Sequence, residues 1–256
     1  MSHRRTGAIL LHEVRLLSRD PLPIMILVVF PLLLIAFLKP MFALALTTHG
    51  HPGANGAEQV VPGEAVINGF YIVGMTSFAF FVEHGWKTWD RLRASNATSS
   101  EIIVGKALPF CFISIVQFLV IFAIGVPLFQ LHSHGPLAAL IPLVAAFALC
   151  LVTLGVMVTS LCRTIQQVSA LAFGGLVLFG ALGGALVPLE VLPGWARSVA
   201  PVTPTYWVMR GFGSVILNGR SLPAIVLPCL VLTGMSLAFV AVSLRRFRFA
   251  DAKVSF

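Results

Sequence analysis

Six long apolar runs, separated by shorter polar gaps, constrain the fold of this chain more than any other feature. They lie near residues 22–46, 66–84, 106–129, 137–161, 168–187 and 223–244. A helix rises 1.5 Å per residue, so each run can cross a hydrocarbon core about 30 Å thick. Only 10% of the residues are charged and 58% are apolar, whereas about a quarter of a soluble domain is charged. The sequence therefore predicts an all-α membrane protein, with residues 1–256 forming a single transmembrane domain.

Positive charge collects in alternate gaps between these runs. One side holds most of the 17 basic residues: Arg4, Arg5, Arg15, Arg19, Lys87, Arg91, Arg93, Lys106, Arg163, Arg245, Arg246, Arg248 and Lys253. The loops 47–65 and 130–136 hold none. The positive-inside rule then predicts that both termini and loop 85–105 face the cytoplasm, with the protein in the plasma (inner) membrane. This topology also explains the net charge of +8 without a nucleic-acid partner.

The arm before the first run, residues 1–20, has two interpretations. On a helical wheel its polar side chains His12, Arg15 and Arg19 lie opposite Leu10, Val14 and Leu17. That pattern predicts an amphipathic helix in the membrane interface, with lipid contacts. A cleavable signal peptide is the alternative, because Arg4 and Arg5 precede an apolar stretch and the small-residue triplet 43–45 follows it. The length of the arm favours the interfacial helix.

The four cysteines lie inside the apolar runs or at their ends, and none belongs to a CxxC motif: Cys111, Cys150, Cys162 and Cys229. They are expected to be small buried residues, and neither disulfides nor metal ligands.

Loop 85–106 holds a short amphipathic pattern. Trp86, Trp89 and Leu92 recur three residues apart and share one helical face, with Lys87, Asp90 and Arg91 opposite. Large aromatic side chains beside arginine suit a contact with another protein. The alternative is that both tryptophans anchor in the headgroup layer. After this pattern, the residues 98–101 form a capping box that is expected to open the third membrane helix.

The segment EHGWKTWDRLRAS, which begins at Glu83, resembles the end of helix 2 and the coupling helix of type-2 ABC exporter permeases. The core of that motif is filled in order by Thr88, Trp89, Asp90, Arg91 and Leu92. The resemblance implies that residues 86–93, including Trp86, form a coupling helix that a cytoplasmic ATPase pushes. It also implies that Glu83 belongs to the hinge before that helix. Without the resemblance, Glu83 is read as half of a local ion pair at the cytoplasmic boundary.

Residues 187–211 resemble the external segment before helix 6 of the same family, on the positions of Pro188, Leu189, Leu192, Pro193, Trp195, Pro201, Pro204, Tyr206 and Arg210. The segment 188–222 is too rich in proline to span a membrane and too apolar for a free loop. Re-entrant or interfacial helices are the physical interpretation.

No Walker A sequence GxxxxGK[ST] occurs, so the chain is not expected to bind ATP, and neither a cofactor nor a metal is expected on it. Gly180 and Gly184, four residues apart, are interpreted as a small-residue face that lets the fifth helix approach a neighbour. Lining a substrate path is the alternative.

Polar residues elsewhere are few. Two His-x-His pairs, His49/His51 and His132/His134, lie in the loops without basic residues and could bind a metal or sense pH. Solvated loop histidines are the default interpretation. Glu83 and Glu190 are taken as the acids nearest to the membrane spans, and Lys39 is expected to extend to the external interface.

These features together predict the permease subunit of an ABC exporter of the drug-resistance-like branch. The resemblance implies a dimer with the same or a homologous permease, two copies of a cytoplasmic ABC ATPase that carry ATP and Mg, and no catalysis by this chain. The expected cargo is amphipathic or hydrophobic, such as a drug, a lipid or a polyketide-like molecule. Two alternatives stay open: a membrane-embedded enzyme that acts on a lipid headgroup, and a non-transporting membrane assembly subunit.

Overall fold

The computed structural model describes residues 15, 19, 22–48, 53–85 and 99–246, and the side chains of 23, 24, 82–85, 99 and 100 lie outside that description. The described part is helical and contains no strand. Six of its helical stretches are long and apolar enough to cross a membrane. The prediction of an all-α fold with six candidate spans is confirmed.

The candidate spans are built from α2 (Leu22–Thr48), α3 (Ala57–Gly69) with α4 (Tyr71–Gly85), α6 (Ser99–Phe129), η1 (Leu137–Leu140) with α7 (Ile141–Leu161), α8 (Ile165–Leu182) and α11 (Pro223–Arg246). Shorter helices connect the last two: η2 (Leu189–Val191), α9 (Gly194–Val199), η3 (Ala200–Val202) and α10 (Pro204–Ile216).

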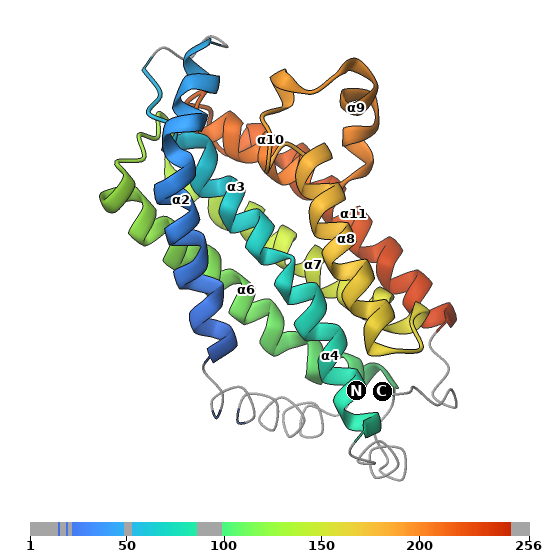
Figure 1. Cartoon of the computed structure of the whole chain (residues 1–256). Coiled ribbons are helices and arrows are strands. Elements are labelled where there is room, and N and C mark those ends of the chain that lie inside the picture. The colour runs from blue at the N-terminus through green and yellow to red at the C-terminus, as the bar shows by residue number, and fades with distance from the viewer. Residues whose placement is uncertain (1–14, 16–18, 20–21, 49–52, 86–98, 247–256) are drawn as a thin grey trace.

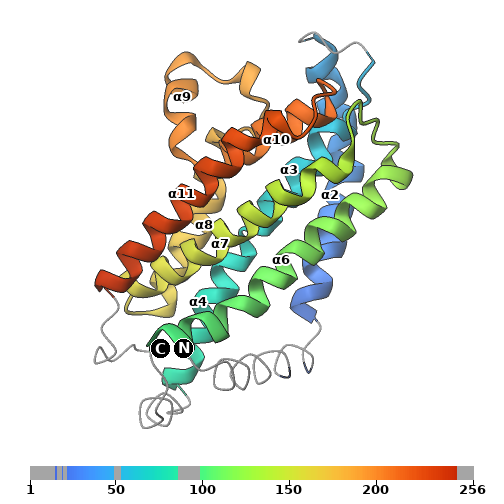
Figure 2. The same cartoon turned by 180° about the vertical axis from the view of Figure 1, so that it is seen from behind.

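The long helices form one bundle with two distinct ends (Figure 1). At one end α2 begins, α4 ends, α6 begins, α7 passes into α8, and α11 ends; we call it the α4–α6 end. The short helices α9 and α10 lie at the opposite end, which we call the α9 end. The view from behind shows α7 between α6 and α11 (Figure 2), and α7 also packs against α4.

The core is apolar and rich in phenylalanine. The ring of Phe118 on α6 lies 5.8 Å from that of Phe147 on α7 and 6.3 Å from that of Phe212 on α10, measured between centroids. All three side chains are fully buried. Aromatic pairs at these separations add to the stability that comes from buried area. This cluster joins a short helix at the α9 end, α10, to two candidate membrane spans.

The outer surface of the bundle is also apolar. Phe37 on α2 is 80% exposed and Phe112 on α6 is 69% exposed, and α8 and α11 carry several exposed leucines. An apolar surface of this extent is unusual for a soluble monomer. It suits lipid chains or another membrane-embedded chain, in agreement with an integral membrane protein.

The bounds of two spans differ from those expected. The second span begins at Ala57, not near residue 66. The third helix begins at Ser99, before its apolar run near 106–129 and at the position that the capping box at residues 98–101 predicts. The fifth helix covers Ile165–Leu182, where 168–187 was expected. The fifth ends early because Gly184 has a φ of +87°, a left-handed conformation that interrupts a helix.

Candidate functional site

The predicted coupling residues connect α4 to α6 in the sequence. Trp86, Thr88, Trp89, Asp90, Arg91 and Leu92 fall within residues 86–98, outside the described part of the chain. Glu83 belongs to the last turn of α4, and its side chain is outside the description too. The role of these residues therefore stays a prediction, while the helices on both sides of them can be examined directly.

α4 is held against α7 by close backbone contact. The hydroxyl of Ser77 donates a hydrogen bond to the carbonyl oxygen of Gly155 over 2.9 Å. A Cβ atom added to Gly155 would lie only 2.9 Å from the carbonyl oxygen of Val73. Small residues allow membrane helices to approach this closely, and the short distance strengthens their packing. A displacement of α4 would therefore also move α7.

α6 is connected to α4 by Lys106, which the sequence placed in the cytoplasmic loop. The structure places Lys106 in the second turn of α6, which begins at Ser99, and its cytoplasmic location stays a prediction. The side chain is 1% exposed; its ammonium group donates to the carbonyl oxygen of Ala79 over 3.2 Å and lies 5.9 Å from the ring centroid of Phe80. A buried ammonium group needs such partners, because its desolvation is costly.

At the α9 end, the start of α3 carries a buried acid that the sequence placed in a loop. Glu58 is 2% exposed, and its carboxylate accepts hydrogen bonds from the backbone N–H groups of Asn55 and Gly56, both over 3.1 Å. The Asn55 side chain in turn accepts from the N–H of Ala57 over 2.9 Å. This reciprocal arrangement satisfies backbone donors that have no partner within a helix. An Asn-x-x-Glu signal was therefore present in the sequence and could have located the start of α3.

Glu58 also binds the connection between α6 and α7. Its other carboxylate oxygen accepts from the backbone N–H of His132 over 3.3 Å and lies 3.7 Å from Nδ1 of the same residue. His134 instead faces the carbonyl oxygen of Ile216, 3.2 Å from its Nδ1. The two described imidazoles have different partners, and no group of three or more metal-ligating side chains occurs among the described residues. His49 and His51 lie outside that part.

Lys39 binds a helix end at the same side of the bundle. Its ammonium group donates to the carbonyl oxygen of Phe129, the last residue of α6, over 2.7 Å. A cation at a helix C-terminus is favourable, because the last carbonyl groups have no partner within the helix. The side chain thus joins α2 to α6.

A second acid, Glu64, lies deeper in the same span. It is 3% exposed and accepts a hydrogen bond from the amide of Asn68 over 3.1 Å. On α6, the amide of Gln117 donates to the carbonyl oxygen of Ala65 over 3.1 Å. Buried polar groups in a membrane span are costly unless they are paired. The sequence interpretation took Glu83 and Glu190 as the acids nearest to the spans. It missed the buried Glu64 and the hydrogen bond from Gln117 on α6 to Ala65 on α3.

The external segment 188–222 folds into short helices started by the expected prolines. Pro188 precedes η2, Pro193 precedes α9, and Pro204 is the first residue of α10. Trp195 is 69% exposed. On α10 the backbone N–H of Tyr206 is bound by the N-cap hydroxyl, and the guanidinium of Arg210 lies 5.6 Å from the ring centroid of Trp207. A re-entrant position in a membrane remains a prediction.

Gly180 and Gly184 do not form one helical face. Gly184 lies beyond the end of α8, and a Cβ atom there would be 2.8 Å from the side chain of Leu189. A Cβ atom on Gly180 would meet Leu186 at 3.2 Å and Ile67 at 3.7 Å. Both glycines pack against parts of the same chain, and a contact of this region with a second subunit stays a prediction.

The sequence comparisons agree with this architecture. A family described as "ABC-2 type transporter" matches residues 4–217. The chain belongs to the ABC-2 type transporter family. The resemblance inferred from residues 83–95 and 187–211 is thereby confirmed at the level of the family.

The permease is similar to proteins from two bacteria. It is 33% identical over 157 residues to the "Linearmycin resistance permease protein LnrN" of Bacillus subtilis (strain 168), which covers 60% of this chain and 39% of that protein. It is 31% identical over 144 residues to the "Probable multidrug ABC transporter permease YbhR" of Escherichia coli (strain K12), covering 55% and 38%. The "Probable multidrug ABC transporter permease YbhS" of the same organism is 20% identical over 196 residues, covering 75% and 52%.

The matched part of the permease spans less than two fifths of the length of the first two relatives. Family membership and the six candidate spans identify it as a transport permease and an integral membrane protein.

Proposed function

We propose that this chain is the membrane-spanning subunit of an ABC exporter that moves an amphipathic or hydrophobic compound outward. The family match over residues 4–217 carries the proposal. The printed names of two relatives, a linearmycin resistance permease and a probable multidrug ABC transporter permease, support a cargo of this class. ATP and Mg would be bound by a separate ATPase, and no cofactor by this chain.

The segment between α4 and α6 would receive the push of the ATPase. Its residues Trp86, Trp89 and Leu92 share one helical face by spacing, which suits insertion into a groove of a partner. α4 is bonded to α7 through Ser77, and α6 to α4 through Lys106. A force on the segment would therefore reach three spans together.

The proposed orientation places the α4–α6 end in the cytoplasm. Arg163, in the short connection between α7 and α8, and Arg245 and Arg246, in the last turn of α11, all lie at this end. Basic residues near span ends favour the cytoplasmic side. With both termini there, two copies of the permease and two ATPases would form the complete exporter.

The test begins with the affinity-tagged permease purified from its own cells. We expect a co-purifying chain with a Walker A sequence GxxxxGK[ST], identified by mass spectrometry, in a complex whose native mass fits two copies of each chain. Trp89→Asp places a charge where an aromatic anchor is expected. Loss of a central anchor costs about 2 kcal/mol or more, roughly thirtyfold in affinity. ATPase retention should fall accordingly.

Trp195→Asp is the matched control, because Trp195 is an exposed tryptophan at the opposite end of the bundle. It should leave ATPase retention and cargo-stimulated hydrolysis unchanged. If Trp89→Asp retains the ATPase and the stimulated rate as well as wild type does, Trp89 is only an interfacial anchor and the coupling role is wrong. If no chain with a Walker A sequence co-purifies, the exporter proposal itself fails.

A further inference from the structure

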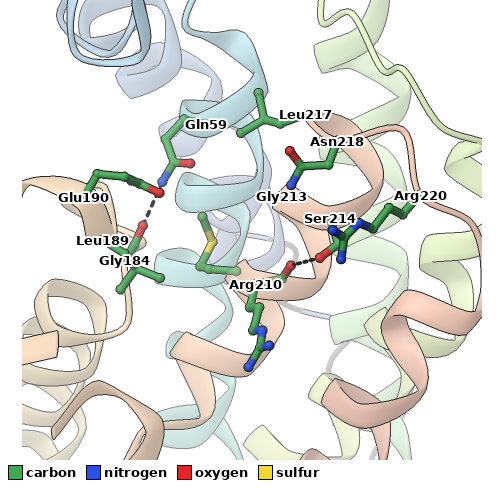
Figure 3. A pocket seen from close by; sticks show the side chains of 11 residues that line it. Gln59, Gly184, Leu189, Glu190, Arg210, Gly213, Ser214, Leu217, Asn218 and Arg220 are labelled. Atoms are coloured by element: carbon green, nitrogen blue, oxygen red, sulfur yellow. Dashed lines mark hydrogen bonds between the residues drawn. The ribbon is translucent and has the colours of Figure 1, made fainter. Parts of the chain in front are cut away.

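A cavity of about 290 Å³ opens at the α9 end of the bundle. Its walls come from three places: the first turn of α3, the turn and η2 that follow α8, and one face of α10 with the turn after it. Figure 3 shows Arg210 and Ser214 on the helix and Arg220 on the following turn. We propose that this cavity binds the anionic headgroup of an amphiphile through Arg210 and Arg220.

The walls are fixed by hydrogen bonds between distant parts of the chain. The amide of Gln59 on α3 donates to the carbonyl oxygen of Gly184 over 2.8 Å, which connects the first wall to the second. The backbone N–H of Arg220 donates to the carbonyl oxygen of Ser214 over 3.0 Å, which folds the turn back over the end of α10. That bond brings two arginines ten residues apart in sequence to the same cavity, so the site exists before any ligand arrives.

The charge of the cavity favours an anion. Two arginines and a single acidic residue, Glu190, are among the residues that line it. Within the described part of the chain neither arginine has an ion pair, and the contact found for Arg210 is with the ring of Trp207. Guanidinium groups donate several hydrogen bonds in a planar fork, which suits phosphate and carboxylate groups. Both side chains are exposed and can be reached from outside the protein.

The size and position of the cavity indicate a headgroup rather than a whole molecule. Pockets for drug-sized ligands hold about 300–1,000 Å³, so this one lies at the lower limit. Leu189 and Met209 give it an apolar wall for the first carbon atoms of a chain. The neighbouring Val191 and Val202 are 50% and 72% exposed, which favours contact of this segment with lipid. The remaining tail would then lie in the bilayer.

Binding can be measured without transport, so failure of this proposal and failure of the exporter proposal are distinguishable. Detergent-purified permease is mixed with phosphatidylglycerol or phosphatidylcholine, and the retained lipid is counted by native mass spectrometry. We expect preferential retention of phosphatidylglycerol. Arg210→Gln and Arg220→Gln should each lower it about tenfold, the loss expected when a charge-assisted hydrogen-bonding partner is removed. Arg163→Gln makes the same charge change at the opposite end and should have no effect.

A second variant fills the cavity and keeps its charge. An added Cβ at Gly213, which lines the cavity, meets no atom within 4 Å, so Gly213→Leu can extend into the open space. Gly234 on α11 is equally open, so Gly234→Leu is the matched control. Gly213→Leu should abolish the preference for phosphatidylglycerol, and Gly234→Leu should preserve it. Each variant must elute as wild type does in size exclusion.

Inorganic phosphate distinguishes the sources of the anion. Competition by millimolar phosphate would support recognition of the free phosphate group itself. Arginine-dependent lipid retention without such competition would support an amphiphile held by both headgroup and tail. Equal retention of both lipids, or retention that survives the arginine and Gly213→Leu variants, would overturn the proposal.

Discussion

Gly56→Ala should destabilise the permease more than any other alanine substitution in the turn before α3. Gly56 has a φ of +92°, a left-handed conformation that costs an alanine about 1–2 kcal/mol. A Cβ atom there would also lie 2.6 Å from the backbone nitrogen of Ala43 on α2. Backbone cannot rotate away as a side chain can, so α2 and α3 must separate, and overpacking of this kind costs about 1–3 kcal/mol. The total is about 2–5 kcal/mol.

The effect is measured by thermal unfolding in detergent. The signal is the fraction of the protein that remains monodisperse. For a chain of this size about 1 kcal/mol corresponds to roughly 2–4 °C, so the midpoint should fall by roughly 4–20 °C. Gly53→Ala is the matched control, because Gly53 is exposed and an added Cβ meets no atom within 4 Å. Equal midpoints for the two variants would refute the close approach of α2 and α3 at this turn.

Two further outcomes are expected. Gly155→Ala should lower the unfolding midpoint, because its Cβ would meet the carbonyl oxygen of Val73 at 2.9 Å. Gly174→Ala, on the open side of α8, should leave the midpoint unchanged. Equal effects of the two substitutions would contradict the α4–α7 contact. In a cysteine-free background, Gly53→Cys should react with a membrane-impermeant maleimide on intact cells and Arg163→Cys only after disruption, and the reverse pattern would contradict the proposed orientation.

The long apolar spans could be predicted from the sequence because length and hydropathy are local properties. The start of the second span was missed, since Pro62 and two glutamates gave residues 57–65 the composition of a loop. In the structure α3 is buried between α2 and α6, where its polar side chains have partners. Lys106 was counted with the cations of loop 85–106, because its carbonyl partner on α4 could not be known from the sequence.

The polar contacts could not be predicted because they join residues far apart in the chain. The ammonium group of Lys39 and the carbonyl of Phe129 are 90 residues apart, and Glu58 and His132 are 74 apart. The motifs at residues 83–95 and 187–211 were together sufficient to recognise the family, since they depend on order and spacing alone. The cavity beside α10 depends on a turn that brings Arg220 back toward Ser214, and no local sequence pattern predicts that turn.

The polar half of the second span has a consequence for biosynthesis. Ala57–Phe81 is the least apolar of the six candidate spans, and a charged side chain at the centre of an inserting helix costs about 2.5–3.5 kcal/mol on insertion scales. Glu64 reaches its buried position in contact with Asn68, on a helix that also contacts α6 through Gln117. The second span is therefore poorly suited to pass from the translocon into the bilayer by itself. It should enter the bilayer together with α6, so that the order of insertion differs from the order of synthesis.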